Sequence, residues 1–69
     1  MQSDLQRKAL RIIVNYTRKY GRPPTIRELM TKTGRNEAGI RAVLKALAEE
    51  RYIEWSGEQP GRIKLVNSG

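Results

Sequence analysis

The residues of this sequence whose types and spacing could do chemistry gather in the segment 36–51. Apolar residues recur there every three or four positions, which predicts a helix with one buried face. The opposite face carries side chains that can read DNA: asparagine pairs with adenine, arginine with guanine, glutamate accepts from cytosine, and alanine can contact a thymine methyl. A solvated helix with charge pairs four residues apart would look similar. The residues concerned are Asn36, Glu37, Ala38, Arg41, Ala42 and Lys45.

The overall charge favours a polyanionic partner. The 69 residues carry 14 Lys and Arg against 7 Asp and Glu, a net charge of +7. Small basic domains most often bind nucleic acid and less often an anionic membrane. The aliphatic run at 12–14 is far shorter than the about 20 apolar residues of a membrane span, and Arg11 and Asn15 interrupt any signal peptide. We expect a cytoplasmic, nucleoid-associated protein that neither binds nor crosses a membrane.

The composition argues against catalysis. The chain has no cysteine and no histidine. Disulfides, thiolate nucleophiles, imidazole bases and almost every zinc site require one of these residues. A chain of this length forms one domain at most. We therefore expect no enzyme activity, no cofactor, no metal and no small-molecule ligand.

Helix signals divide the first part of the chain into three segments, 1–20, 25–33 and 36–51. Ser3 and Thr25 are each followed, three residues later, by Gln or Glu, which is the spacing of a capping box. A glycine follows each of the first two segments and can end the helix in a left-handed conformation. The second segment is only about two turns long, and a short glycine-containing turn joins it to the third, as in a helix-turn-helix.

Gly39 interrupts the third predicted helix. Glycine in a helix interior costs about 1 kcal/mol relative to alanine. We therefore expect a close approach at this position, to another helix or to a ligand.

The hydrophobic period changes from 3.6 to 2 beyond the third segment. Ile53 and Trp55 alternate with polar residues, and Ile63 and Leu65 do the same after the turn-rich stretch 57–61. This pattern predicts an antiparallel hairpin with one apolar face, which must pack on the helices to be stable. Trp55 shares that face and is interpreted as a core residue rather than a stacking platform for bases.

The expected fold is therefore mostly α with a small β-hairpin (α+β), a three-helix winged helix-turn-helix. Residues 1–66 would form this domain and residues 67–69 a flexible tail. In such a fold the third helix lies in the major groove, and the hairpin, or wing, reaches the backbone or the minor groove.

Contacts with phosphates are expected outside the third helix. The amino end of the second helix offers free backbone amides, which attract a phosphate. Basic residues flank that helix, and the hairpin carries further cations that point away from its apolar face. Each of these residues alone could be a solvated charge. The residues predicted to contact the backbone or the minor groove are Arg22, Thr25, Arg27, Lys32, Gln59, Arg62 and Lys64.

Several short motifs occur in collinear order. They are GRPPT at 21–25, REL at 27–29, LKALA at 44–48, YIE at 52–54 and SG at 56–57. Together they resemble the N-terminal DNA-binding domain of the LexA repressor family, over nearly the whole chain. The resemblance implies a winged helix-turn-helix that reads a palindromic operator in double-stranded DNA. Carried over by position, it implies operator contacts by Arg35, Asn36, Glu37, Ala38, Arg41 and Ala42, with Lys45 and the wing near the backbone.

The sequence also departs from the family pattern. The segment 34–37 is one residue shorter than the family's turn, and Arg41 stands where the family tends to carry an acid. The operator is therefore not expected to be that of the SOS response. The self-cleaving Ser/Lys peptidase that dimerises the family's repressors is not among these 69 residues.

Three functions are compatible with these patterns. The leading hypothesis is a sequence-specific transcription regulator that binds double-stranded DNA, either as a monomer or as a homodimer on a palindromic or repeated operator. The alternative is a small phage- or plasmid-type adaptor that uses the winged helix to bind a protein partner. Nonspecific, nucleoid-type binding would differ from the first hypothesis only in its specificity ratio.

Overall fold

A computed structural model describes residues 3–66 of the chain, and the predicted tail at 67–69 lies outside the described residues. Three helices are followed by a two-stranded antiparallel sheet, which confirms the predicted order of a winged helix-turn-helix. The elements are α1 (Asp4–Tyr20), α2 (Ile26–Thr33), α3 (Glu37–Glu49), β1 (Ile53–Glu54) and β2 (Lys64–Leu65).

Local side-chain contacts start the first two helices where the sequence predicts. The Ser3 hydroxyl accepts a hydrogen bond from the Gln6 amide, and the Gln6 side chain accepts one from the Ser3 amide. Thr25 and Glu28 form the same reciprocal pair at the start of α2. Each box satisfies two amides that the helix leaves without a partner. The N-terminal ends of these two helices are therefore set by residues at most three positions apart.

Asn36 begins α3 and also explains Gly39. The Asn36 side-chain oxygen accepts a hydrogen bond from the Gly39 amide at 2.8 Å. A Cβ atom on Gly39 would lie 3.2 Å from that same oxygen. The closest approach at Gly39 is made by the cap of its own helix, so the expected approach of another helix is wrong for the described residues. The expected approach of a ligand stays a prediction.

The third helix ends at Glu49, two residues before the predicted end. Arg51 has a φ angle of 66°, which turns the chain out of the helix, and the Tyr52 amide donates to the Leu47 carbonyl at 3.0 Å. This reversal returns the chain toward the core, where Ile53 is buried. The earlier end thus follows from the need to bury the first strand.

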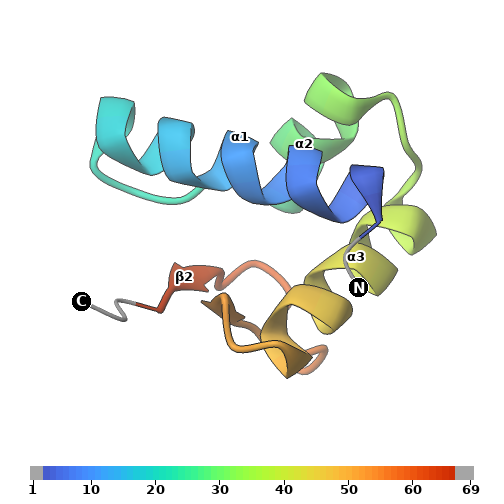
Figure 1. The fold of residues 1–69 in the computed structure, drawn as a ribbon. Coiled ribbons are helices and arrows are strands. Elements are labelled where there is room, and N and C mark those ends of the chain that lie inside the picture. Colours follow the sequence, from blue (N-terminus) through green and yellow to red (C-terminus); the bar gives the residue numbers. More distant parts are fainter. Residues whose placement is uncertain (1–2, 67–69) are drawn as a thin grey trace.

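The core lies between the three helices and the hairpin, and α3 is central to it. In Figure 1, α1 runs across the top of the molecule and the hairpin lies below. α3 packs against α1, α2 and β1. The buried apolar side chains come from every helix and from both arms of the hairpin: Ala9, Ile13, Leu29, Ile40, Val43, Leu44, Leu47, Ile53 and Ile63.

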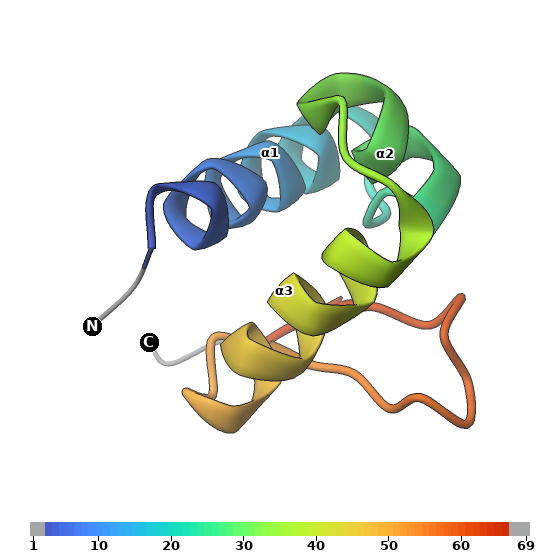
Figure 2. The same ribbon diagram turned by 90° about the vertical axis from the view of Figure 1, so that its right-hand side faces the viewer.

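The hairpin is shorter than the sequence pattern suggests. Ile53 pairs with Leu65 and Glu54 with Lys64, and the ladder has no further pairs among the described residues. The predicted apolar face is nevertheless confirmed, because Ile63 is buried and Trp55 packs against the core. The loop between the strands extends to one side of α3 (Figure 2).

None of the helices within residues 3–66 has the length and apolar character needed to cross a lipid bilayer.

Gly34 provides a test of how α2 is ended. Its φ angle is 72°, a left-handed conformation that costs a residue with a Cβ atom about 1–2 kcal/mol. We expect Gly34→Ala to lower the free energy of unfolding by about that amount, measured by urea denaturation. Gly57→Ala is the matched control, because nothing lies within 4 Å of the added Cβ and its φ angle is not positive. Gly57→Ala should leave stability unchanged or raise it by about 0.4–1 kcal/mol. Equal losses in both variants would contradict this account.

Candidate nucleic-acid interface

The outward face of α3 is not covered by other parts of the described chain. Ala38, Ala42 and Lys45 are exposed, as is Glu37 in the first turn, while Arg41 is half-buried. The buried residues of α3 all lie on the other side of the helix, against the core. Because the two alanines have small side chains, no bulky group projects from the middle of this face. A helix with such a face can approach the floor of a DNA major groove closely.

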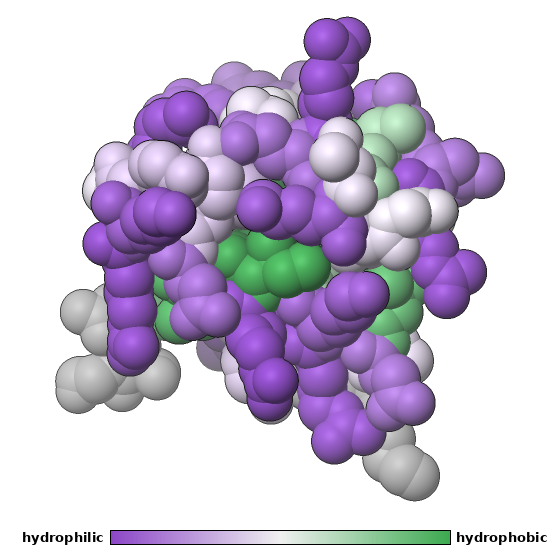
Figure 3. Space-filling model, turned by 90° about the horizontal axis from the view of Figure 1, so that it is seen from above, coloured by the Kyte–Doolittle hydropathy of each residue, from purple (hydrophilic) through white to green (hydrophobic). Residues whose placement is uncertain are grey.

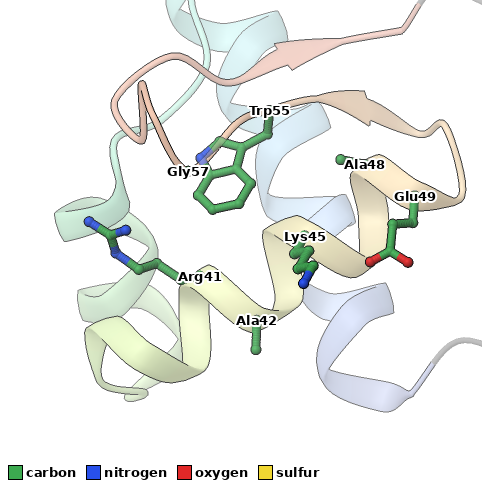
Figure 4. A pocket seen from close by; sticks show the side chains of 7 residues that line it. All are labelled: Arg41, Ala42, Lys45, Ala48, Glu49, Trp55 and Gly57. Atoms are coloured by element: carbon green, nitrogen blue, oxygen red, sulfur yellow. The ribbon is translucent and has the colours of Figure 1, made fainter.

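The hairpin forms one wall of a groove beside this face. The groove has a volume of about 550 Å³ and is lined by Arg41, Ala42, Lys45, Ala48, Glu49, Trp55 and Gly57. Figure 4 shows Trp55 and Gly57 on the hairpin side and the other five side chains on α3. The hairpin is thus held alongside α3 rather than across its outward face.

Trp55 has two roles in this arrangement. Its ring is half-buried and packs against the core, as predicted, and it also lines the groove. The indole Nε1 donates a hydrogen bond to the Pro60 carbonyl at 3.1 Å. Further hydrogen bonds inside the loop join Gln59 to Ser56 and Arg62 to Gln59. These contacts give the wing a defined shape although its ladder is only two residues long.

A second groove joins three elements that are far apart in the sequence. It has a volume of about 420 Å³ and brings together the amino end of α2, the first turns of α3 and the tip of the wing. Its lining residues are Thr25, Ile26, Arg27, Met30, Glu37, Arg41, Pro60 and Gly61. Four of the residues predicted from sequence to contact DNA therefore lie in one groove. Arg41 lines both grooves and occupies the centre of the surface.

Arg41 is held by a neighbour on its own helix. Its Nε donates to the Glu37 Oε2 at 2.9 Å, an ion pair between residues four positions apart. Within the described residues, no hydrogen bond involves the two Nη atoms of Arg41. An exposed pair of this kind contributes only about 0.3–0.5 kcal/mol to stability. The pair matches the interpretation of these residues as solvated charges, and it leaves the Nη atoms of Arg41 available to an external acceptor.

Asn36 is less available than the sequence suggests. Pairing with adenine uses both the oxygen and the nitrogen of the side-chain amide. The structure places the oxygen in the cap of α3, where it accepts from the Gly39 amide. A two-point contact with adenine would have to use the second lone pair of this oxygen, because the first accepts from Gly39. The Nδ2 group is free of the cap and can donate to a base or a phosphate.

The match with a known family is consistent with this geometry. A family model described as the LexA DNA binding domain matches residues 2–62, which include all three helices, β1 and most of the loop between the strands. The chain belongs to the LexA DNA-binding domain family. A comparison with curated protein sequences gives no match. Membership makes this chain a DNA-binding domain of a regulator, with double-stranded DNA as its partner.

The remaining predicted contact residues of this LexA-type domain line neither of these two grooves. Arg35, Gln59, Arg62 and Lys64 are all exposed, the first in the turn before α3 and the others on the hairpin. Lys32 lies apart from the amino end of α2, which it was expected to flank. It occupies the last turn of that helix and lines a different groove, shared with the C-terminal part of α1. Its contact with DNA stays a prediction.

A cluster that the sequence did not reveal ties the LexA-type helix-turn-helix to α1. The Tyr16 hydroxyl on α1 donates a hydrogen bond to the Glu28 carboxylate on α2. The other carboxylate oxygen accepts from the amide and the hydroxyl of Thr25, each at 3.2 Å. Arg22 lies 3.8 Å from the same oxygen and 5.4 Å from the centroid of the Tyr16 ring. The cluster fixes the loop before α2 and the amino end of that helix against α1.

Spacing alone could not have found this cluster. Thr25 and Glu28 are recognisable as a capping box, but Tyr16 lies on a different helix and meets Glu28 only because α1 and α2 pack together. The hydrogen bond from Tyr16 lowers the pKa of the Glu28 carboxylate below its ordinary value. The same bond raises the pKa of the Tyr16 hydroxyl.

The lowered pKa of Glu28 predicts a dependence of stability on pH. A carboxyl group whose pKa is lower in the folded state stabilises the fold above its ordinary pKa, and this contribution is lost as pH falls through the folded value. We expect Tyr16→Phe to reduce the loss of unfolding free energy between about pH 6 and about pH 3, around the ordinary glutamate pKa of about 4.3. Urea denaturation at a series of pH values measures this loss. Tyr20→Phe is the control, because Tyr20 is exposed and its hydroxyl makes no hydrogen bond within residues 3–66. Identical pH profiles for wild type and Tyr16→Phe would contradict the assignment.

Proposed function

We propose that this LexA-type domain is a sequence-specific transcription regulator that inserts α3 into the major groove of an operator. One observation carries the proposal. The open face of α3 is flanked on one side by two grooves, and Arg41 lies where the amino end of α2, α3 and the wing tip converge. In this pose the two alanines admit the helix to the groove floor, and α2 and the wing rest on the backbone on either side.

Arg41 is the proposed base reader. A guanidinium donates two parallel hydrogen bonds to O6 and N7 of guanine, the commonest specific contact in the major groove. Glu37 holds the Nε of Arg41 and leaves its two Nη atoms available to donate to a base. A restraint of this kind lowers the entropy that the side chain loses on binding. Ala38 and Ala42 would contact the methyl groups of thymine.

The amino end of α2 is the proposed phosphate site. The Glu28 amide donates to the Thr25 hydroxyl and the Leu29 amide to the Thr25 carbonyl. The amides of Ile26 and Arg27 have no such acceptor among the described residues, so they can donate to a phosphate at the positive end of the helix. The positively charged side chain of Arg27 lies in the same groove.

Further backbone contacts complete the proposed interface. We assign them to Arg22 and Arg35 beside the helix-turn-helix, to Lys45 on α3, and to Gln59, Arg62 and Lys64 on the wing. Lys32 would contribute through long-range attraction from the end of α2. Two copies on a palindromic or repeated operator would form a homodimer on DNA, and such a regulator would act in the cytoplasm, on the nucleoid.

Selection of bound duplexes from a random pool, read at two salt concentrations, tests the proposal most directly. We expect an enriched motif, and a palindrome or direct repeat in it would show the symmetry of binding. The affinity for that motif should fall steeply with salt, because each neutralised phosphate adds about 0.9 to the slope of log K against log salt. Equal affinity for scrambled duplexes would refute sequence-specific regulation.

Removal of the Arg41 side chain tests the proposed base reader. We expect Arg41→Ala to cost about 1–3 kcal/mol on the selected operator and to relax specificity at one base position. Lys45→Ala is the matched comparison, since it removes one positive charge from the same helix. That change should weaken binding about equally on all sequences and reduce the salt slope by about 1. Quantitative binding to operators substituted at each position distinguishes the two patterns. A uniform loss in Arg41→Ala would remove Arg41 from base recognition.

A further inference from the structure

The positive charge of the chain is distributed unevenly. Residues 1–36 carry nine of the 14 Lys and Arg residues but only two of the seven acidic ones. Residues 37–69 carry five of each, so α3 and the hairpin together have no net charge. The whole excess of +7 therefore belongs to α1, α2 and the adjoining turns. The face proposed to read bases is not the most basic part of the molecule.

Part of this excess forms a ridge along α1, defined by Arg7, Arg11 and Arg18. All three residues are exposed. At 3.6 residues per turn they project from the side of α1 opposite to its buried residues Ala9 and Ile13. The face of the molecule over α1 and α2 is covered mainly by hydrophilic side chains, with a small apolar area recessed between them (Figure 3).

The ridge points away from the proposed base-reading face. α1 and α3 pack against each other through their buried sides, so their exposed sides face in different directions. A duplex bound along α3 would therefore leave the ridge in solvent. DNA binding by α3 therefore does not explain why three arginines line the far side of α1.

We propose that the ridge is a second, sequence-independent surface that binds the phosphate backbone of duplex DNA. Binding at the ridge does not depend on base recognition by α3. The consequence that one molecule joins two duplex segments, one on each face, does rest on the proposed function of α3.

The spacing of the arginines suits a phosphate backbone. Along the helix axis, Arg7 and Arg11 are about 6 Å apart and Arg11 and Arg18 about 10 Å apart, at 1.5 Å per residue. Duplex DNA presents a negative charge about every 1.7 Å of its axis, so a straight row of cations meets several phosphates. The guanidinium group also binds phosphate through two parallel hydrogen bonds.

The surroundings of the ridge favour DNA over an acidic protein. Protein interfaces are anchored by tryptophan, tyrosine and arginine in well-packed, desolvated pockets, so arginines at such an interface are expected beside aromatic or apolar partners. The exposed large hydrophobic residues among residues 3–66 are Tyr20, Tyr52 and Val66, and none belongs to the ridge.

Among residues 3–66, Asp4 is the one acid that forms an ion pair with the ridge. It pairs with Arg7 at 2.9 Å, with side-chain exposures of 99% and 68%. A pair so exposed contributes little, and a phosphate can replace the carboxylate.

Two charge-matched triple variants test the proposal. The ridge variant is Arg7→Gln, Arg11→Gln and Arg18→Gln, and the reading-face variant is Arg41→Gln, Lys45→Gln and Arg62→Gln. Each removes three positive charges from exposed or half-exposed positions, and circular dichroism with thermal melting establishes that both fold. A duplex of scrambled sequence is immobilised, protein is added at low salt, and capture of a second, fluorescent duplex is measured. Binding of one duplex to each variant is titrated at several salt concentrations.

We expect the wild-type chain to capture the second duplex and the ridge variant to lose that capture. The ridge variant should keep its preference for the selected operator over scrambled DNA, while its salt slope on scrambled DNA falls by about 1 for each arginine removed. The reading-face variant should lose the preference for the operator and also the capture of a second duplex, because capture needs both faces, while one scrambled duplex still binds through the ridge. Replacement of the three arginines by lysine should restore most of the capture, because charge is kept and only the paired hydrogen bonds are lost.

The proposal is overturned if the ridge variant binds scrambled DNA with the affinity and the salt slope of wild type. A wild-type chain that captures no second duplex, while the ridge variant loses affinity for scrambled DNA, would support the ridge and refute only the joining of two duplexes by one molecule. Binding of an acidic peptide at the ridge without binding of DNA there would also overturn the proposal, in favour of a protein partner. Loss of operator preference is a separate outcome. A wild-type chain that shows no preference for any sequence, but loses affinity for scrambled DNA when the ridge arginines are replaced, would refute the proposed function and support the ridge proposal.

Discussion

Burial of one side of α3 is the constraint on which the rest of this structure depends. Ile40, Val43, Leu44 and Leu47 lie on that side and supply almost half of the buried apolar cluster. A chain of this size has room for a single core, so every other element must pack against these residues. The opposite side of α3 is then left in solvent because no further element remains to cover it. The same packing that stabilises the fold therefore leaves exposed the side of the helix that we propose to bind DNA.

The positions of the flanking elements follow from the same constraint. The hairpin buries Ile53 and Ile63 beside α3, which places the wing next to the open face rather than over it. The hydrogen bond from Trp55 to Pro60 closes the loop, so the wing keeps its shape with a very short ladder. On the other flank, the cluster around Glu28 fixes the amino end of α2. Arg41 lies in the groove where the amino end of α2, the first turns of α3 and the tip of the wing meet.

Charge and shape are divided between two parts of the molecule. The exposed face of α3 has small side chains at its middle and almost no net charge. These properties suit a close approach to the bases and discrimination between them. The excess charge on α1 and α2 supplies long-range attraction to a polyanion without carrying sequence information. A LexA-type domain that separates the two properties in this way has attraction for DNA on more than one side. Its affinity and its specificity would then depend on different residues.

The sequence by itself determined the helix starts, the apolar stripes and the family, because caps, periodicity and short motifs depend on residues close together in the chain. Ser3, Thr25 and Asn36 cap their helices through partners three positions away. Only the tertiary structure decided which residues meet across elements. The contact of Tyr16 with Glu28, the position of Arg41 between α2 and the wing, and the shortness of the strands all depend on how the elements pack around α3. Packing is a property of the whole core, and no local spacing encodes it.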